Sequence, residues 1–198
     1  SRDEEHVIGR ARTGMVGRAK MGFRKDGRIT ALDLFIVEDN GPYGPMGDHR
    51  SAANAASLIW QPQAMRFRGV PVITNTPPRS QQRSPGPMQG NGIVEPVVTK
   101  AAKKLGLDQV AIRRINSPEG KALYGPPVGG ARRHVTSAFV RNALDRGVEL
   151  FNWEARKAQA ATRRGSKVRG LGVAIGPHGA GSIGYDGLMT IQPDGKLH

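Results

Sequence analysis

Apolar and polar residues alternate along residues 16–24 and again along 29–37, which is the two-residue period of half-buried β-strands. Asp26 and Gly27 lie between the two stretches and suit a tight hairpin turn, because both positions tolerate positive φ. The spacing is irregular at residues 31–32, which predicts a β-bulge in the second strand. The pattern therefore predicts an antiparallel hairpin in the first part of the chain.

The next stretch predicts one helix and one further strand. Residues 50–60 are rich in alanine and follow Asp48, a residue type that caps helix N-termini, so we expect a helix there. Residues 65–73 are apolar enough for a strand, but Gly69 and Pro71 interrupt them. These interruptions favour a bulged strand or one at the edge of a sheet.

Farther along, apolar residues recur every three or four positions, which is the period of an amphipathic helix. One helix is expected over 93–105 and should end at Gly106. A shorter helix over 110–115 should begin after a capping Asp108, with Arg113 on its outer side.

The last third of the chain mixes polar helices, strands and glycine-rich turns. Residues 121–133 contain Gly-Pro-Pro and Gly-Gly and predict an irregular segment. The other expected elements are a third helix capped by Thr136 or Ser137, a fourth helix and two strands, over residues 139–144, 148–162, 168–175 and 183–191.

Strands, then helices, then strands in one chain predict the α+β class. We treat residues 1–198 as a single domain in four parts. Residues 1–75 are expected to be mainly strands with one helix, 76–90 a loop that carries the candidate site, 91–165 helical and 166–198 strands.

Composition narrows the possible chemistry. The apolar fraction of 37% is low and 27 glycines accompany 14 prolines, so we expect many turns and a modest core. The absence of cysteine excludes a disulfide, a thiol nucleophile and an iron–sulfur cluster built from this chain. No apolar run is long enough to span a membrane. The charged opening predicts no signal peptide and suggests a processed or excised chain, expected in the cytoplasm, with the periplasm left open.

The formal charge of +14 indicates an anionic partner. The basic residues are scattered in pairs and short groups, and the aromatic content of 5% offers no obvious platform for stacking bases. Nucleic acid is therefore the less favoured partner, and a basic face that docks on another protein is favoured. A basic module that binds RNA or an acidic protein is kept as an alternative function.

The loop at residues 76–90 has the strongest potential for chemistry. Its prolines make it rigid, and it lies between an expected strand and an expected helix start. A guanidinium on such a loop, that of Arg83, can meet an anion or a polarised oxygen. The alternative is a surface connection with solvated arginines.

An ordered set of short motifs accompanies this loop. The set comprises Thr74-Asn75, Arg83-Ser84-Pro85-Gly86-Pro87-Met88-Gln89, Glu95, Leu105-Gly106-Leu107-Asp108 and Arg113-Arg114-Ile115-Asn116. It resembles the molybdenum-binding large subunit of the xanthine dehydrogenase and aldehyde oxidase family, over a part of that subunit. The opening Arg2-Asp3-Glu4-Glu5 and Arg169-Gly170-Leu171-Gly172 fall in the order expected for the family.

The resemblance implies roles for five residues of the loop. Arg83 would stand beside the molybdenum centre as the catalytic residue of this chain and stabilise charge on a substrate oxygen. Ser84, Pro85, Gly86 and Gln89 would contact the cofactor, although Gln89 could instead cap the following helix. Ser84 has no thiolate for a copper–molybdenum centre, and Pro85 replaces the aromatic residue that stacks purines.

The resemblance also implies a cofactor and partners. The expected cofactor is molybdopterin with molybdenum, in the cytosine dinucleotide form and shared with other chains. The expected partners are the remainder of the molybdenum subunit, an iron–sulfur subunit, a flavin subunit carrying FAD, and a small-molecule substrate. The implied reaction hydroxylates an electron-poor carbon, in an aldehyde or N-heterocycle, with oxygen from water.

Several residues are expected to be structural. Glu95 is interpreted as a helix residue that bonds neighbouring backbone and not as the general base. The five histidines are scattered without metal-ligand spacing, so no metal ligand is expected from this chain. A structural subunit whose site has decayed is the third hypothesis, because Ser84, Pro85 and Pro87 depart from the family pattern.

Overall fold

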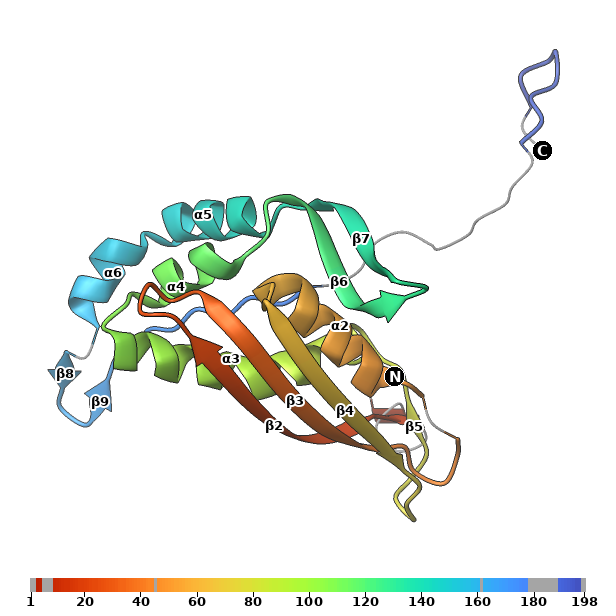
Figure 1. Ribbon diagram of the computed structural model, residues 1–198, viewed down its shortest axis with the longest axis horizontal. Coiled ribbons are helices and arrows are strands. Elements are labelled where there is room, and N and C mark those ends of the chain that lie inside the picture. Colours follow the sequence, from red (N-terminus) through yellow and green to blue (C-terminus); the bar gives the residue numbers. More distant parts are fainter. Residues whose placement is uncertain (1–2, 5–8, 45, 161, 178–188, 197–198) are drawn as a thin grey trace.

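A computed structural model describes residues 3–4, 9–44, 46–160, 162–177 and 189–196. Its centre is a three-stranded sheet in the order β2 (Gly14–Phe23), β3 (Ile29–Asp39), β4 (Ala64–Val72). β2 and β3 are antiparallel and β4 runs parallel to β3 (Figure 1). The predicted hairpin is therefore confirmed, and β4 takes the edge position that Gly69 and Pro71 indicated.

The hairpin turn and its bulge differ slightly from the sequence prediction. Residues 24–28 close the turn through a hydrogen bond from Arg24 N to Arg28 O of 2.8 Å, and Gly27 has a φ of 90°. The strand register shifts where Gly22 faces Ala31 and Phe23 faces Ile29, so the extra residue is Thr30. The bulge lies next to the predicted place.

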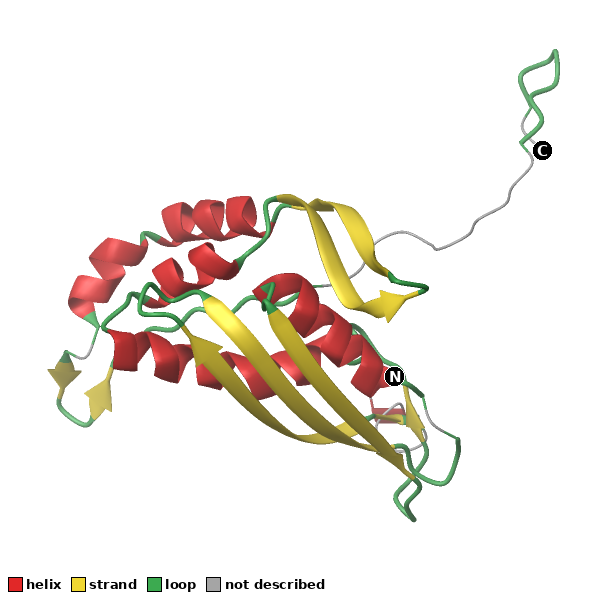
Figure 2. Cartoon of the chain, viewed as in Figure 1, coloured by secondary structure: helices red, strands yellow, loops and turns green. Residues whose placement is uncertain are grey.

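Two helices cover one face of the sheet, α2 (Asp48–Trp60) and α3 (Pro87–Leu105) (Figure 1). Alternate residues of β3 point into this layer, and they pack there on the alanine-rich side of α2 and on Val94 and Val98 of α3. This arrangement buries Trp60 and Ile59 completely. The α+β class is confirmed, because strands and helices occupy separate layers (Figure 2).

The helix boundaries show which capping signals were effective. α4 (Gln109–Asn116) begins after Asp108, whose Oδ1 accepts hydrogen bonds from Val110 N and Ala111 N, as predicted. α3 ends at Gly106, as predicted, but begins six residues before residue 93. Pro87 occupies its first turn, where the missing amide hydrogen is not needed.

The segment after α4 corrects the sequence analysis. Residues expected to be irregular form a hairpin of β6 (Gly120–Val128) and β7 (Ala131–Ala138). Thr136 and Ser137 therefore lie in a strand and cap no helix. α5 (Val140–Phe151) follows Phe139 without a side-chain cap. Glycine and proline suggested irregular chain, but here they form the bulged and turning parts of a strand pair.

The remaining helix is shorter than expected. Asn152 takes positive φ (54°) and separates α5 from α6 (Trp153–Gln159). Two short strands follow, β8 (Arg163–Arg164) and β9 (Lys167–Val168). The predicted strand at 168–175 is wrong as a sheet strand, because beyond Val168 it pairs with no strand among the described residues. Most of the strand expected at 183–191 lies outside the described residues.

Candidate functional site

The candidate site loop connects β4 to α3 and is tied to the start of the chain. Within it, β5 (Arg79–Ser80) pairs in parallel with β1 (Ala11–Arg12). Ala11 N donates to Pro78 O at 3.2 Å, and Gln82 Nε2 donates to Arg10 O at 2.7 Å. The loop is thus fixed by backbone pairing as well as by its prolines.

Asp39, at the end of β3, organises the entry to the loop. Its carboxylate accepts hydrogen bonds from Thr74 Oγ1 (2.6 Å), Thr76 Oγ1 (3.1 Å), Gly41 N (3.0 Å) and Arg79 Nη2 (2.9 Å). The Thr74 hydroxyl and then the Gly41 amide lower the pKa of Asp39 to about 2. Sequence reasoning missed this cluster, although the spacing of Thr74 and Thr76 after a strand was a usable signal.

Asp48 fixes the loop from the opposite side. The N-cap of α2 is Gly47 with a φ of 80°, so the predicted capping role of Asp48 is wrong. The buried carboxylate instead accepts hydrogen bonds from Thr13 Oγ1 and Gln81 Nε2, each at 2.9 Å. Asp48, in the first turn of α2, therefore connects Thr13, which precedes β2, with the candidate site loop.

Gly86 and Gln89 form the junction between loop and helix. Gly86 has a φ of 90°, and a Cβ there would lie 2.1 Å from Asp48 O, so the close approach it permits is to α2. Gln89 Oε1 accepts from Gly86 N at 3.2 Å, and its Nε2 donates to Thr13 O at 2.9 Å. The capping role considered for Gln89 is confirmed, and both its amide oxygen and its amide nitrogen are engaged in hydrogen bonds.

Ser84 and Pro85 form the bend itself. Ser84 adopts a positive φ of 56°, and its Oγ donates to Pro177 O at 3.3 Å. Pro85 is half-buried. The bend therefore lies beside residues 176–177, which bring the distant C-terminal part of the chain to the candidate site.

Arg83 lies on the surface. Its carbonyl accepts from Arg12 Nη2 at 2.9 Å, while its exposed guanidinium has no hydrogen-bond partner among the described residues. Arg83 does not line the large groove described below. The pocket wall expected around Arg83 therefore stays a prediction.

Two arginines beside the candidate site loop each keep one nitrogen without a hydrogen-bond partner among the described residues. Two buried guanidinium nitrogens, Arg12 Nη1 and Arg79 Nε, have no hydrogen-bond partner within the described ranges. Unpaired buried donors are costly, and positively charged donors match phosphate oxygens. Both nitrogens are covered by protein and Arg79 already pairs with Asp39, so these donors do not by themselves form a phosphate site in this structure.

Glu95 proves to be structural, as the sequence predicted. Its Oε1 accepts from Ile175 N at 2.6 Å, and its Oε2 contacts Arg113 Nη2 in a buried ion pair. Arg113 also donates to Thr99 Oγ1 (3.0 Å) and to Gln109 O (2.8 Å). The predicted outward position of Arg113 is wrong, because its side chain is completely buried between α3 and α4.

Asn116 connects α4 to the hairpin. Its Nδ2 donates to Gly27 O at 2.9 Å and to Ile112 O at 2.8 Å, and its Oδ1 accepts from Ile29 N at 2.9 Å. Arg113 and Asn116, both on α4, therefore bond to two different neighbours of this helix. Arg113 bonds to α3, and Asn116 bonds to the hairpin. Neither residue contacts the candidate site loop.

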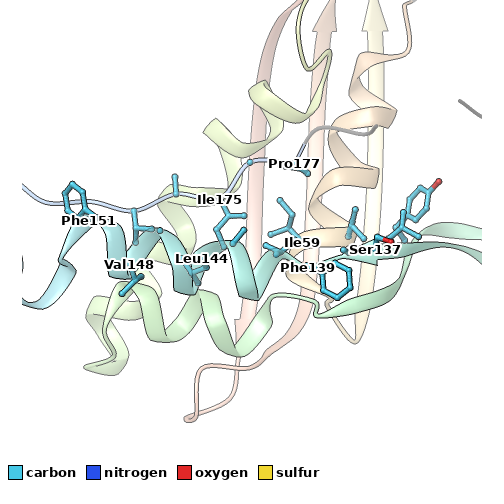
Figure 3. A pocket seen from close by; sticks show the side chains of 18 of the residues that line it. Ile59, Ser137, Phe139, Leu144, Val148, Phe151, Ile175 and Pro177 are labelled. Atoms are coloured by element: carbon cyan, nitrogen blue, oxygen red, sulfur yellow. The ribbon is translucent and has the colours of Figure 1, made fainter. Parts of the chain in front are cut away.

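An open groove of about 1240 Å³ runs between α5, β7, the end of α2 and residues 172–177. Its lining is largely apolar, and Figure 3 shows Leu144 and Val148 of α5 facing Ile175 across it. Pro177 also lines the groove, and its carbonyl accepts a hydrogen bond from Ser84 Oγ. One lining residue of the groove therefore contacts the bend of the candidate site loop.

The two histidines that the structure describes, His49 and His134, belong to no metal-binding cluster. Within the described ranges, no three His, Asp or Glu side chains gather closely enough to hold one. His49 is buried and its Nδ1 contacts Glu38 Oε2, and His134 lines the groove. His6, His178 and His198 lie outside the described residues. None of the helices that the structure describes combines the length and apolar character needed to cross a membrane.

Comparison with known proteins agrees with the resemblance seen in the sequence. A family described as "Molybdopterin cofactor-binding domain" matches residues 1–117. The putative xanthine dehydrogenase molybdenum-binding subunit XdhA of Escherichia coli K12 is 30% identical over 97% of this chain and 27% of its own length. Indole-3-acetaldehyde oxidase of Arabidopsis thaliana is 33% identical over 89% of the chain and 13% of its own length.

Solved structures share the fold. Quinoline 2-oxidoreductase from Pseudomonas putida 86 superposes with a TM-score of 0.61 at 25% identity, over 74% of this chain and 19% of that protein. Aldehyde oxidoreductase from Desulfovibrio gigas gives a TM-score of 0.59 at 25% identity, over 75% and 16%.

The chain spans about a quarter of the length of the Escherichia coli relative. Its family match includes the hairpin, α2, the candidate site loop, α3 and α4. The chain belongs to the molybdopterin cofactor-binding domain family and corresponds to part of the molybdenum-binding region of xanthine dehydrogenase and aldehyde oxidase relatives.

Proposed function

We propose that this chain supplies part of the cofactor and substrate site of a molybdenum hydroxylase. The assembled enzyme would hydroxylate an electron-poor carbon, in an aldehyde or an N-heterocycle, with oxygen from water. The observation that carries the proposal is the family match over residues 1–117, which contains the entire candidate site loop. The alternative of an RNA-binding module is not favoured, because it leaves the loop and the order of the motifs unexplained.

Arg83 is the residue of this chain proposed to touch substrate. Its guanidinium is exposed and unpaired among the described residues, on a loop held by β1, Asp39 and Asp48. A fixed positive charge on a rigid support stabilises negative charge that develops on a substrate oxygen. Bound molybdenum cofactor would supply the redox chemistry, and Arg83 would orient the substrate beside it.

Other loop residues would hold or shape the site. Ser84 and Pro85, which form the bend of the loop, are proposed to line the cofactor. Gly86 and Gln89 are positioning residues, because their contacts fix the bend to α2 and β2. Without an aromatic side chain, Pro85 offers no stacking surface to a purine, which favours a non-purine substrate.

The rest of the site would come from other polypeptide. We propose the cytosine dinucleotide form of molybdopterin, a carboxylate base outside these residues, and iron–sulfur and FAD subunits as electron acceptors. Glu95 is unavailable as the base, since both carboxylate oxygens are engaged in a buried cluster. The isolated chain is expected to show no turnover.

The proposal is tested in the assembled complex with Arg83→Ala and Arg83→Lys. Loss of an oriented charge should lower kcat with an aldehyde substrate by about 10²–10³-fold. Molybdenum content, measured by mass spectrometry of the metal, should stay at the wild-type level. The lysine variant should recover part of the activity. Arg24→Ala, on the exposed hairpin turn, is the matched control and should retain full activity.

Two outcomes would contradict the proposal. Full activity of the Arg83→Ala complex at full molybdenum occupancy would remove Arg83 from the site. A correctly assembled wild-type complex without molybdenum or pterin would instead support the structural subunit with a decayed site.

A further inference from the structure

One face of the three-stranded sheet is left uncovered by the described residues. α2 and α3 lie on the opposite face (Figure 1). Alternate residues of β2, β3 and β4 point to the open face, and several of them are exposed, among them Val16 (76%), Val70 (38%) and the side chain of Arg66 (81%). The open face of a sheet is normally polar, so its particular composition indicates what it contacts.

The strand register arranges this face in four rows. Each row takes one residue from each strand, because β3 pairs with β2 on one side and with β4 on the other. We call these rows together the basic face. Counted from the hairpin turn, they are Gly22–Ala31–Ala64, Lys20–Asp33–Arg66, Arg18–Phe35–Arg68 and Val16–Val37–Val70.

The two central rows carry an excess of positive charge. Four basic side chains and one carboxylate give them a net charge of +3. Asp33 is already engaged, since Nε and Nη2 of Arg66 donate to its two carboxylate oxygens. The other three cations donate no hydrogen bond to any described residue, and they are Arg18, Lys20 and Arg68.

Arg68 is held in one orientation by Phe35. Its guanidinium carbon lies 4.3 Å from the centroid of the Phe35 ring, which is half-buried in the middle of the face. A guanidinium stacked on a ring keeps its N–H groups free at its edge, where they can donate to a carboxylate in a bidentate pair. The stacking also occupies one side of the only aromatic ring in the four rows, which disfavours stacking of nucleic-acid bases there.

The acidic residues of this chain do not complete the basic face. Most acidic side chains in the described ranges already pair with a basic one elsewhere, as Asp108 does with Lys157 and Glu119 with Arg141. The residues outside those ranges include only two acids, which are Glu5 and Asp186. Two carboxylates so far apart in the sequence do not form a row of acids that would match three neighbouring cations.

We propose that the basic face binds an acidic surface of a separately folded partner subunit. A charged contact suits an interface between separate proteins, because burying the same cations inside one polypeptide would cost desolvation energy. Strand geometry sets the pattern on the partner, with carboxylates about 7 Å apart in one direction and about 10 Å apart in the other. An apolar strip beside them would cover the row of valines.

A hollow in the surface gives this contact a defined position. It is open, has a volume of about 490 Å³ and lies over the row of small residues, with Lys20, Asp33 and Arg66 at its border. A long acidic side chain of the partner can lay its apolar stem on Ala31 and Ala64 and bring its carboxylate to Lys20. The hollow therefore favours glutamate at one position of the partner surface.

Two other occupants fit the basic face less well. A two-fold contact with a second copy through this face would bring Arg18, Lys20 and Arg68 against like charges, which repel. RNA would satisfy the cations but would leave the valines exposed. The inference uses the partner subunits of the proposed function and is independent of its chemistry.

Carbodiimide crosslinking of the assembled molybdenum enzyme tests the contact at Lys20. The reagent joins an amine to a carboxylate when the two are in direct contact, and mass spectrometry identifies the linked peptides. Lys20 should be linked to an Asp or Glu of a different subunit, and the yield should fall about tenfold at high salt, where exposed charges are screened. Links only to carboxylates of this chain's own polypeptide, in the same molecule or in a second copy, would overturn the proposal. So would the absence of any link at Lys20.

Charge reversal by Arg18→Glu with Arg68→Glu tests the face as a whole. Lys104→Glu with Lys121→Glu is the matched control, because it changes the net charge equally at exposed positions of α3 and β6. The apparent Kd for subunit release, measured by mass photometry of the complex at low salt, should rise about 10–100-fold for the first pair. The control should stay within about twofold of the wild type.

Thermal unfolding of each variant confirms that it is folded. Equal Kd values for the folded variant and its control would contradict the proposal. Subunits that stay attached while binding of poly(U) RNA is lost would identify RNA as the occupant and overturn it as well. None of these readouts depends on molybdenum content or turnover, so they separate this inference from the proposed function.

Discussion

The two sides of this molecule differ in how completely they are built. The sheet with α2 and α3 supplies twelve of the thirteen buried apolar residues of one cluster, and Ile112 of α4 is the thirteenth. A second cluster, between α4, α5, α6 and residues 171–175, has only Val110, Leu144 and Trp153 as its buried members. Exposed large apolar side chains occur on both sides, for example Val16 and Val70 on the sheet and Leu150 and Phe151 on α5. Among the described residues, the first side therefore holds the larger buried core.

The two sides also differ in their relation to the site. The candidate site loop is anchored mainly on the side of the sheet, through Asp39, Asp48 and Thr13. Among the described residues, the other side reaches it through Pro177, whose carbonyl accepts a hydrogen bond from Ser84 Oγ. The loop is therefore held chiefly by its contacts with the sheet and α2.

The buried pair of Glu95 and Arg113 connects the two sides, and breaking it should have the largest effect. Glu95→Gln leaves the guanidinium of Arg113 buried without a counter-charge, which should lower the free energy of unfolding by about 3–5 kcal/mol. Urea unfolding of the 198-residue chain measures this. Glu149→Gln breaks the exposed pair with Arg146 and should change stability by less than ~0.5 kcal/mol. Equal effects of the two variants would contradict the structural role of the buried pair.

Truncating equivalent side chains on the two sides should sharpen the contrast. Leu34→Ala removes a fully buried side chain from β3 and should cost about 3 kcal/mol, through lost burial and a cavity. Leu150→Ala on α5 starts from a side chain that is 71% exposed and should cost less than ~0.5 kcal/mol. Both values come from denaturant unfolding of the isolated chain. A large loss for Leu150→Ala would show that α5 is already covered.

Asn116→Ala should separate the hairpin turn from α4. The variant loses three buried hydrogen bonds to Gly27, Ile29 and Ile112, so a loss of about 2 kcal/mol is expected. Hydrogen exchange should also quicken at the amide of Ile29. Unchanged exchange there would mean that the turn is held by other contacts.

The contribution of Asp39 to the free energy of unfolding should be the smallest of these effects, and it should be visible only at acid pH. The fold lowers its pKa to about 2 from an ordinary 3.8, so its contribution is fully present above about pH 4 and is lost as the pH falls through 2. Over that range the free energy of unfolding should drop by about 1 kcal/mol from this half-exposed group. Asp39→Asn should abolish that part of the pH dependence, and Thr74→Val should reduce it. Acid titration of the unfolding midpoint distinguishes these outcomes.

Local sequence signals determined the elements whose stability is local. The alternating pattern of β2 and β3, the three-and-four spacing of α3 and the cap at Asp108 each act within a few residues, so the sequence alone revealed them. The rigidity of the loop before α3 was likewise visible in its prolines. The ordered motifs around it identified the family that residues 1–117 match.

Tertiary structure decided everything that depends on a distant partner. Asp48 became a buried acceptor for Thr13 and Gln81 because the loop folds back on α2, which no local rule predicts. Arg113 moved inside because Glu95, eighteen residues away, offers a charge there. Residues 169–177 have a strand's pattern but pair with no strand among the described residues, because pairing requires a second chain segment beside the first. A sequence fixes what each residue can bond, and only the packed fold determines which bonds are within reach.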